Sequence, residues 1–535
     1  MGTTAELTAT AASRVAARAG PFHTAGLWSR DPVDLVADAA QAHASRAALV
    51  DRSRSLTYDE LDAAVDGAAA ALEHAGARPG DAVFLLAGND AASAVAIHGA
   101  LRLGALVMVA PVGAGAAQVR DIVAMASPVL AAAPAGVPGA GSGTEPGSGP
   151  GVTRWLDIGS IGTAEPERRV PRPRRDPDEP AMVIFTSGTT SRPKGVIHSL
   201  NTLLLATRNF VDATALAPDD NIFVISPLAS VTGIMQAITV APLVGAQVTI
   251  ESHFDAAATL DLLVETDGTF FGGPDLLLGR VLAEAERRGI AAVPIRVVYI
   301  GGAMADRRTL ERAEREFGIT VLRAYGSSEA PLSTSSALGE PAHVRLADDG
   351  RPLAGVDVRI GSQHDPAECC IGGAHLFLGY VDPADDEHAF ERDADGRDWF
   401  CTGDLAELHD GRLTITGRIK DVVIRNGMKI PISEVDGMVA ALPAVVQCAG
   451  YGVTDPATGE RLAIAVRCRP GAVLTYDDMV AGLVAAGAAK WKIPEELVLW
   501  DDPLPENAAG KIVRDRLEPG GAARPRTVAP RLRGG

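Results

Sequence analysis

Apolar positions in the first part of the chain recur in two alternating patterns. After a Thr-Tyr-Asp-Glu capping box at residues 57–60, apolar side chains recur three or four residues apart, which predicts a helix over residues 56–77. Continuous apolar runs at residues 81–87 and 105–110 predict buried strands, with a helix over residues 90–102 between them. Strands that alternate with helices in this way are typical of a parallel, doubly wound sheet.

The same rhythm resumes after two stretches rich in Gly, Pro and charge, residues 134–151 and 165–180, which we expect to be surface loops. Further strands are predicted at residues 182–185, 222–225, 247–250, 269–271, 296–300 and 320–324. After residue 356 the pattern changes to short alternating strands, the last of them at residues 413–416.

These patterns predict an α/β fold of two domains. Residues 1–419 form a large N-terminal domain of doubly wound sheets with additional small strands, and residues 420–517 form a smaller, hinged α+β C-terminal domain. The tail over residues 518–535 is rich in Pro, Arg and Gly, and we expect it to be disordered.

Charge and composition exclude several classes of function. A formal net charge of −18 over 535 residues argues against binding to nucleic acid or to an anionic membrane. No apolar run approaches the ~18 residues of a membrane-spanning helix, and the N-terminus does not resemble a secretory signal. The five cysteines form no CxxC pair, so neither a disulfide framework nor a zinc site is predicted, and we expect a cytoplasmic protein.

The segment Phe185–Gly195 (FTSGTTSRPKG) carries the strongest chemical signal. It follows a predicted strand and combines hydroxyls, glycines and one ammonium, which together suit a polyphosphate. Only six of the 49 basic residues are lysines, so a specific role is favoured for a lysine in this loop. The candidate phosphate ligands are Thr186, Ser187, Gly188, Thr189, Thr190 and Lys194.

With this loop the chain resembles the adenylate-forming superfamily of acyl-CoA synthetases, adenylation domains and luciferases. The resemblance continues at YGSSE, residues 325–329, directly after a predicted strand. It implies that Tyr325 lies against adenine, that the hydroxyl residues meet the phosphates, and that Glu329 holds Mg²⁺. The nucleotide-binding residues implied here are Gly301, Gly302, Ala303, Tyr325, Gly326 and Ser327, with Ser328 and Glu329 in catalytic positions.

Four further segments match the family in the same order along the chain. Asp404 of a TGD motif is implied to bind the ribose hydroxyls, and Arg418 to contact ribose and phosphate. Lys420 matches the position about which the small domain rotates, and Lys511 matches the lysine that bridges substrate carboxylate and α-phosphate. The implied coenzyme A loop contains Asn426, Gly427 and Lys429.

Three positions depart from the family pattern. Ser191 stands where glycine is usual, Ser328 where threonine is common, and Ser230 where an aromatic residue or histidine helps to place the carboxylate. One interpretation is ordinary variation with full activity, and the other is that adenylation is slow or lost. The residues expected to line the acyl pocket are Ser230, Thr232, Gly233, Phe271, Gly272 and Ala324, and the small side chains among them favour a wide ring system over a slim chain.

The resemblance implies an AMP-forming acid–thiol ligase that uses ATP, Mg²⁺ and coenzyme A to activate a bulky apolar carboxylic acid. Two alternatives stay open within that chemistry. The chain could mainly convert an adenylate made by a separate adenylating enzyme to a thioester, or it could load a carrier protein instead of coenzyme A. A third alternative, from another class, is a nucleotide-binding pseudoenzyme that senses an acyl-adenylate.

Overall fold

The computed structural model describes residues 4–137, 154–164, 173–186, 192–301, 307–425, 428–455, 457–506, 512–518 and 524–529, and of residues 4–9 and Lys429 the backbone alone. The chain divides into two compact units. The larger unit comprises Met1–Val358 and Ile371–Phe400, and the smaller unit comprises Arg359–Cys370 and Cys401–Gly535. No helix in the described ranges is both long and apolar enough to cross a membrane.

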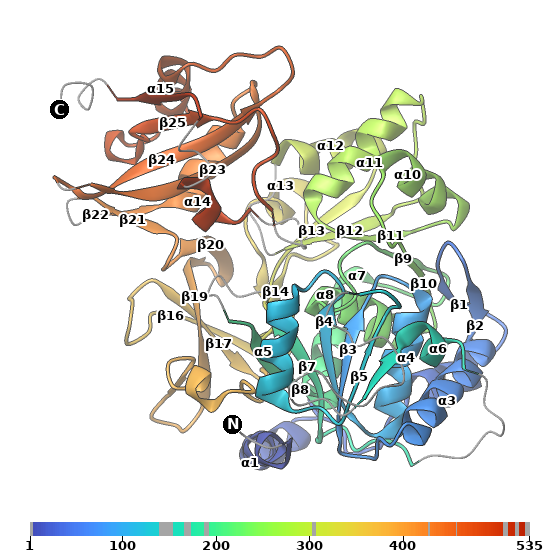
Figure 1. Ribbon diagram of the computed structural model, residues 1–535. Helices are drawn as coiled ribbons and strands as arrows, with labels where there is room; N and C mark the ends of the chain where they lie inside the picture. The colour runs from blue at the N-terminus through green and yellow to red at the C-terminus, as the bar shows by residue number, and fades with distance from the viewer. Residues whose placement is uncertain are drawn as a thin grey trace. The chain divides into compact units, whose positions relative to one another are not determined.

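Two sheets form the framework of the larger unit (Figure 1). The first sheet is parallel except for its last pair, β7 with β8. Its strands, in spatial order, are β6 (Trp155–Asp157), β5 (Leu130–Ala133), β3 (Ala82–Ala87), β4 (Leu106–Pro111), β7 (Pro180–Thr186) and β8 (Lys194–Ser199).

The second sheet has nine strands and is parallel from β13 to β1, with antiparallel strands added at both edges. Its strands, in spatial order, are β15 (Arg351–Pro352), β14 (Thr334–Ser335), β13 (Thr320–Tyr325), β12 (Val297–Gly301), β11 (Phe270–Gly272), β9 (Asn221–Val224), β10 (Gln247–Ile250), β1 (Ala47–Val50) and β2 (Ser55–Thr57).

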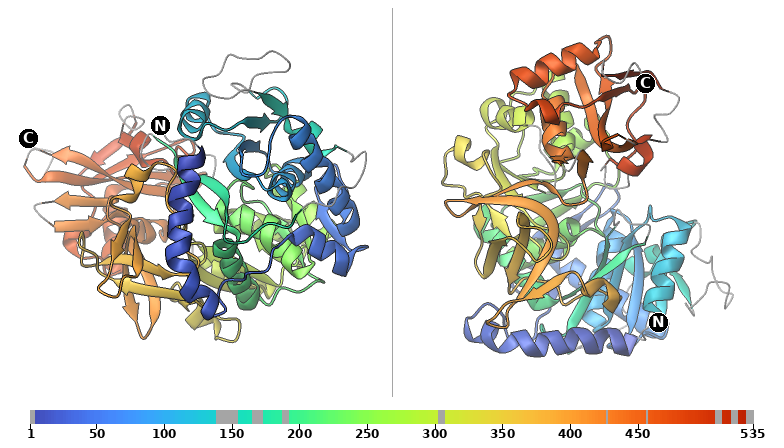
Figure 2. Two further views of the ribbon diagram at one scale, coloured as in Figure 1. Left: turned by 90° about the horizontal axis from the view of Figure 1, so that it is seen from below. Right: turned by 90° about the vertical axis from the view of Figure 1, so that its left-hand side faces the viewer.

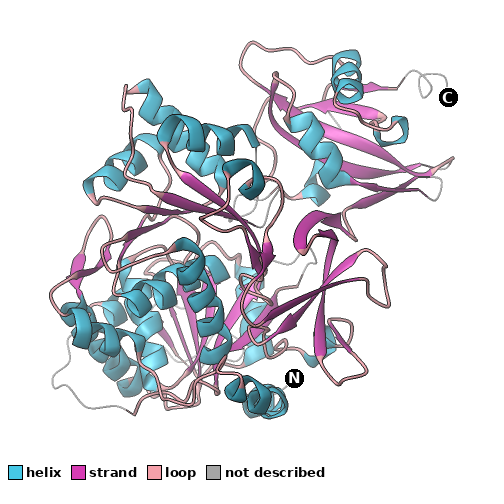
Figure 3. Cartoon of the chain, turned by 180° about the vertical axis from the view of Figure 1, so that it is seen from behind, coloured by secondary structure: helices cyan, strands magenta, loops and turns pink. Residues whose placement is uncertain are grey.

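Helices cover both faces of these sheets because alternate residues of each strand are buried on opposite sides (Figure 3). Val83 and Leu85 of β3 belong to the core between the two sheets, whereas Phe84 and Leu86 pack under α5. The helices of the larger unit are α1 (Thr4–Thr24), α2 (Leu35–His43), α3 (Tyr58–His74), α4 (Ala91–Leu103), α5 (Ala116–Ala126), α6 (Ile158–Gly162), α7 (Leu200–Thr214), α8 (Val231–Gly233), the π-helix η1 (Ile234–Val240), α9 (Ala241–Val244), α10 (Ala256–Glu265), α11 (Asp275–Arg287), α12 (Arg307–Phe317), α13 (Ala342–Arg345) and the 3₁₀ turn η2 (Pro383–Asp386).

The chain then passes through a third set of strands, and the division between the two units falls within it. These strands are β16 (Val356–Ile360), β17 (Glu368–Gly373), β18 (Phe390–Arg392), β19 (Asp398–His409) and β20 (Arg412–Arg418). The rest of the smaller unit packs α14 (Ile432–Ala440) and α15 (Tyr476–Ala485) on a mixed sheet. Its remaining elements are β21 (Val422–Arg425), β22 (Met428–Pro431), β23 (Val445–Asp455), β24 (Gly459–Cys468), η3 (Lys490–Lys492), β25 (Glu496–Leu499), η4 (Arg514–Arg516) and β26 (Arg526–Val528).

The structure confirms the predicted α/β architecture and the capping box, in which the Thr57 side chain accepts from the Glu60 backbone and the Glu60 side chain accepts from that of Thr57. It differs from expectation in three places. Residues 4–24 form helix α1, which the sequence pattern did not predict (Figure 2). The smaller unit also includes Arg359–Cys370 and residues 401–419, which were expected in the N-terminal domain. Within the tail expected to be disordered, residues 526–528 form β26, which pairs antiparallel with β25 because its extended backbone completes an open sheet edge.

Candidate active site

The predicted nucleotide-binding segments of the larger unit meet at the carboxyl ends of neighbouring strands. Tyr325 ends β13 and Gly301 ends β12, and Gly301 lies opposite Ala324 in the parallel register. A Cβ added to Gly301 would lie 2.7 Å from the carbonyl oxygen of Ala324, so this approach requires glycine. Ligands of open α/β sheets bind at this edge. The predicted Gly302 and Ala303 lie outside the described residues.

The segment after β13 is held in a compact turn. The backbone N–H of Ser327 donates to the carbonyl of Ala330 (3.1 Å), and the Ala330 N–H donates to the Ser327 hydroxyl (3.2 Å). Leu332 then takes a positive φ of 48°, which is unfavourable for a branched side chain and marks a strained loop. This turn sets the direction in which Ser328 and Glu329 leave the sheet.

Glu329 is fixed at both its backbone and its carboxylate. Its carbonyl accepts from the N–H of Phe377 (2.9 Å), and its Oε1 accepts from the hydroxyl of Tyr380 (2.8 Å). Burial and the neighbouring Glu329 charge raise the pKa of Tyr380, so this hydroxyl keeps its proton and donates it. Sequence reasoning missed Tyr380, which lies 51 positions after Glu329 in a segment without a recognisable chemical pattern.

Glu329 fits the predicted role of magnesium ligand. Its Oε2 has no hydrogen-bond partner among the described residues, and the group is only half-buried. In the same described ranges, no cluster of three or more His, Cys, Asp or Glu side chains could hold a cation by itself. Magnesium is commonly held by one or two carboxylates together with water and phosphate oxygens, which agrees with a single glutamate at this edge.

Arg192 and Lys194 belong to the described part of the predicted phosphate loop, whose residues 187–191 lie outside it. The Lys194 ammonium is 3.2 Å from Asp385 and 4.7 Å from the centre of the Tyr380 ring. Arg192 pairs with Asp382, and this hydrogen bond lowers the pKa of the Asp382 carboxyl. Thr186 ends β7 opposite Lys194, and its hydroxyl contacts the Lys194 carbonyl (3.4 Å). Both cations at this loop are therefore balanced by carboxylates of the segment that carries Tyr380.

A buried histidine joins β8 to the Ser328 backbone. His198 Nε2 lies 2.7 Å from the Ser328 carbonyl, and its Nδ1 lies 3.0 Å from the hydroxyl of Thr202. Burial lowers the pKa of His198 to about 4, so the ring is neutral at pH 7 and donates to Ser328 from Nε2. His198 is a second residue that sequence reasoning missed, although it lies only four positions after Lys194.

The predicted acyl-pocket segment, residues 226–233, is held by Asn89, a third residue that was missed. The Asn89 amide donates to the carbonyl of Ser226 (3.0 Å), and its oxygen accepts from the Leu228 N–H (2.7 Å). A polar residue two positions after the end of the buried strand β3 is the signal that could have identified it. Ser230 caps α8, because its hydroxyl donates to the Pro227 carbonyl (2.7 Å) and accepts from the Gly233 N–H (3.1 Å).

The other predicted pocket residues differ in exposure. Thr232 is exposed, whereas Gly233 is packed against the Pro227 carbonyl. Phe271 stacks on Phe223 with 6.2 Å between ring centres and belongs to the core under α10 and α11. Gly272 and Ala324 lie at the carboxyl ends of β11 and β13, so the sheet places both at one edge.

In the smaller unit, Asp404 and Arg418 form one pair. Arg418 Nε lies 2.7 Å from Asp404 Oδ1, across the antiparallel register of β19 and β20. Asp404 is 5% exposed, and its N–H donates to the Thr402 hydroxyl (3.1 Å). The Gly403 N–H donates to Glu368 Oε1 (2.8 Å), which fixes the turn of the TGD motif. This geometry suits a carboxylate held ready for hydroxyl donors.

Lys420 is exposed in the turn between β20 and β21. Its predicted role at the rotation of the small domain stays a prediction. The same holds for Asn426, Gly427 and Lys511, which lie outside the described residues, and for Lys429, of which the structure gives only the backbone.

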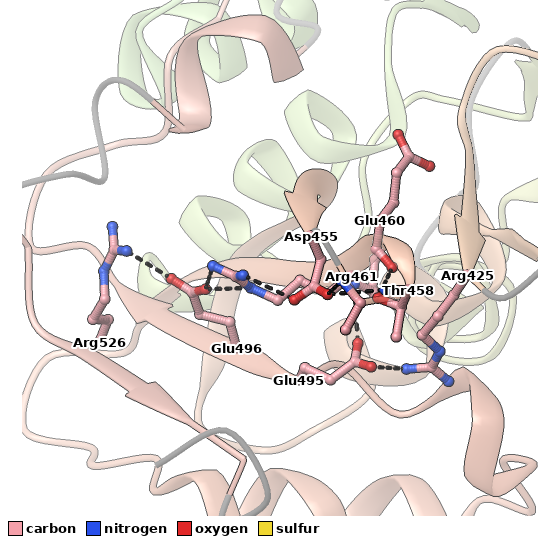
Figure 4. Close-up of polar contacts among 10 residues, drawn as sticks. Arg425, Asp455, Thr458, Glu460, Arg461, Glu495, Glu496 and Arg526 are labelled. Atoms are coloured by element: carbon pink, nitrogen blue, oxygen red, sulfur yellow. Dashed lines mark hydrogen bonds and ion pairs between the residues drawn. The ribbon is translucent and has the colours of Figure 1, made fainter. Parts of the chain in front are cut away.

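The strand before the predicted coenzyme A loop ends in a buried ion pair (Figure 4). The Arg425 guanidinium pairs with Glu495 and donates to the Trp491 carbonyl, and Glu495 Oε2 also accepts from the Leu462 N–H (3.0 Å). The neighbouring Ile424 N–H donates to Glu460 Oε2 (2.6 Å). Both residues at the end of β21 are thus anchored to the adjoining β24 and β25 region.

A second set of charges extends this network along β24 and β25 (Figure 4). Arg461 lies 3.3 Å from Asp455 and 3.3 Å from Glu496, and Arg526 of β26 lies 3.0 Å from Glu496. Glu496 is nearly fully buried between these two arginines. The network explains why β26 joins the sheet although the surrounding tail has few apolar residues.

Comparison with known proteins agrees with this arrangement. Residues 36–381 match the model of the AMP-binding enzyme family, and residues 434–511 match the AMP-binding enzyme C-terminal domain. A methyl-dioxo-octahydroindenyl-propanoyl:CoA ligase of Mycobacterium tuberculosis is 30% identical over 502 residues, which cover 88% of this chain and 95% of that protein. Its counterpart in Rhodococcus jostii is 32% identical over 64% of this chain, and the alignment spans only 65% of that ligase.

Other relatives share the fold over most of the chain. A Streptomyces salicylyl-CoA synthase / salicylate adenylyltransferase is 28% identical over 93% of this chain and 95% of its own length. Among solved structures, O-succinylbenzoate coenzyme A synthetase from Bacillus subtilis, in complex with AMP, superposes with a TM-score of 0.79 at 22% identity, covering 91% of this chain and 98% of that one. On the family match and the 30% identical ligase, the chain belongs to the AMP-binding enzyme family.

Proposed function

We propose that this chain is an acyl-CoA ligase for a bulky, largely apolar carboxylic acid, which it activates with ATP and transfers to coenzyme A. The observation that carries the proposal is the convergence of Gly301, Tyr325 and Glu329 at the carboxyl ends of β12 and β13. Two relatives in the same family support the acid class, because their names describe a fused alicyclic ring that bears a propanoyl chain.

The chain's own residues would contribute mainly by position and charge. Glu329, oriented by Tyr380, would hold Mg²⁺, whose chemistry is to neutralise charge on the phosphates. The substrate carboxylate would attack the α-phosphorus, forming an acyl-adenylate and releasing pyrophosphate. Lys511 would stabilise the charge that develops there, and no side-chain nucleophile is required. A thiol would then attack the acyl carbon and release AMP.

A second candidate is that the chain chiefly performs the thiol-transfer step on an adenylate supplied by a separate enzyme. The observation that favours it is the capping role of Ser230, whose hydroxyl is engaged with Pro227 and Gly233. In the adenylate-forming superfamily, a bulky residue at this position helps to place the substrate carboxylate. Ser230 has a short side chain there instead. Loading of a carrier protein in place of coenzyme A is a variant of the same chemistry.

The two half-reactions, measured separately, distinguish these candidates. With a panel of bulky alicyclic acids, we expect pyrophosphate release that requires ATP and acid, and acyl-CoA formation from the synthetic adenylates. Lys511→Ala should reduce the first reaction by about 100-fold or more while leaving the second nearly unchanged, since one electrostatic donor contributes about that much. Lys490→Ala, at an exposed lysine outside the candidate site, is the matched control.

Each outcome selects one function. Acyl-CoA formed from adenylate with no pyrophosphate release from any acid would support the transfer-only candidate. Faster transfer to a carrier protein than to coenzyme A would identify the loading enzyme. Absence of both half-reactions over the whole panel would contradict the ligase proposal.

A further inference from the structure

Gln236 carries a buried amide oxygen that none of the described residues satisfies. It lies within the π-helix η1, all seven residues of which are buried, and it is 2% exposed. Its Oε1 is fully buried and has no hydrogen-bond partner among the described residues. Buried polar groups in native proteins are nearly always paired, so an unpaired one calls for a partner beyond the described residues, such as water or a bound ligand.

The amide of Gln236 lies directly on Gly272. A Cβ added to Gly272 would lie 2.0 Å from Gln236 Oε1 and 2.7 Å from its Cδ, so glycine is needed to leave room for the amide. The Gly272 carbonyl accepts from the N–H groups of Ile225 and Ser226 at 3.1 and 3.2 Å. Gln236 is therefore placed at the carboxyl ends of β9 and β11, beside the segment that begins at Ser226.

Ligands of open α/β sheets bind at this edge, the carboxyl ends of the strands. The π-helical conformation of η1 also favours a ligand site here. π-helical turns are rare and occur often at functional sites, because the extra residue re-aims neighbouring side chains. Ile234 and Ile238 of the same helix, and Val224 at the end of β9, belong to the apolar core. One polar group at the apolar end of a sheet is what a small-molecule site uses to orient its ligand.

We propose that Gln236 determines acyl specificity by hydrogen bonding to an oxygen substituent on the ring of the acid. The inference rests on the proposed ligase function and adds to it the chemistry of the substrate. A carboxamide offers one acceptor and two donors, so it pairs with a hydroxyl through Oε1 or with a ketone through Nε2. The favoured acid is thus a bulky alicyclic one with a single polar oxygen away from its carboxylate.

The test uses sets of three acids that share one carbon skeleton and carry a ketone, a hydroxyl or a hydrogen at the same ring position. We expect the wild-type enzyme to prefer one oxygenated acid over the plain acid in kcat/KM by about tenfold or more, because an unmatched buried polar group is costly. The preferred member of the set shows which end of the amide is used. Gln236→Met, which keeps the length and removes the polar atoms, should abolish that preference and leave the plain acid accepted at least as well.

Two control variants separate specificity from folding. Gln247→Met replaces a glutamine in β10 whose amide donates to Thr249 (3.0 Å), and it should leave the ratio between the acids unchanged. Gly272→Ala keeps Gln236 but displaces its amide, so it should lower the ratio as well, whereas Gly115→Ala, where a Cβ meets nothing within 4 Å, should not.

The outcomes distinguish this inference from the proposed function. The inference alone is overturned if wild type, Gln236→Met and Gly272→Ala all turn over the panel with the same ratio of kcat/KM between the oxygenated and the plain acid. That result would indicate that the amide contacts only water. A wild-type enzyme that turns over no acid and no adenylate overturns the proposed function and this inference with it. If Gln236→Met fails to fold, the ratio in Gly272→Ala decides.

Discussion

Three histidines of the larger unit are buried in their neutral form. Burial lowers the pKa of His98 to about 4, of His198 to about 4 and of His375 to about 3. In the unfolded chain a histidine titrates near pH 6.5, so between about pH 4 and 6.5 the unfolded state binds more protons than the folded state. Stability therefore rises with pH across this window and is lost as the pH falls through it.

Replacing one of these histidines should flatten the pH dependence. For His198→Gln we expect the free energy of unfolding to fall less steeply on acidification, by about 1 kcal/mol per pH unit near pH 5, because one fewer proton is taken up on unfolding. Denaturant unfolding at pH 7 and pH 5 measures the difference. The exposed His343→Gln should retain the wild-type slope, and an unchanged slope in His198→Gln would show that this ring is charged when folded.

Single residues of the candidate site differ in how far the sequence reveals them. Glu329 and Asp404 stand in short motifs with a recognisable order, so they could be predicted. Tyr380 could not, because its importance lies in a contact with a residue 51 positions away. Asn89 left one weaker signal, its place just after a buried strand, but its contact with Leu228, 139 positions away, left none. Gln236 was missed because it stands out only by its unpaired amide oxygen. The lack of a hydrogen-bond partner among the described residues can be seen only in the three-dimensional packing.

At the scale of elements, helix α1 is attached to the segment that orients Glu329. Arg18 donates to Asp398 (3.0 Å) and to the Phe377 carbonyl (2.9 Å), and Arg14 donates to Asp386 (2.9 Å). Asp386 in turn accepts from the N–H of Tyr380 (2.9 Å). Helix α1 thus supports the position of Tyr380 from outside the candidate site.

Removing the buried end of this attachment should destabilise the larger unit. We expect Arg18→Leu to lower the free energy of unfolding by about 2–3 kcal/mol, because Asp398 would lose its buried partner. Arg392→Leu is the matched control, since Arg392 pairs with the same carboxylate from a side chain that is 66% exposed, and it should cost at most about 1 kcal/mol. Equal losses in the two variants, measured by denaturant unfolding, would show that burial of Arg18 adds nothing.

The elements that the sequence predicted are those with a strong local pattern. The apolar runs of β3, β4 and β10 and the capping box of α3 are complete within a few residues, and each was predicted to within one or two positions. Helix α1 has only a narrow stripe of mostly small apolar residues (Ala11, Val15, Ala19 and Phe22), and its attachment depends also on Arg14 and Arg18 meeting distant carboxylates. The strand β26 depends likewise on Arg526 reaching Glu496. Such long-range pairs leave no periodic signal.

At the scale of the whole molecule, each unit has its own apolar core. The core between the two sheets of the larger unit is built from residues 36–332, and the largest core of the smaller unit from residues 423–529. Each unit also contains one helix that begins with a capping box, α3 at Thr57 and α15 at Thr475. The two boxes provide matched reporters of local stability, because the same substitution removes the same kind of contact from each.

If the units unfold as separate cooperative blocks, each cap should affect only its own unit. We expect Thr57→Ala to lower the stability of the larger unit, and Thr475→Ala that of the smaller, by about 1 kcal/mol each. Calorimetry should then show two transitions, of which each variant moves one by a few degrees, while Thr57→Ser and Thr475→Ser, which keep the oxygen, move neither appreciably. A single transition that both alanine variants lower together would mean that the two cores unfold as one. Two transitions would agree with the rotation of the smaller unit that the family resemblance implies, because a unit that changes orientation during turnover has to keep its own fold.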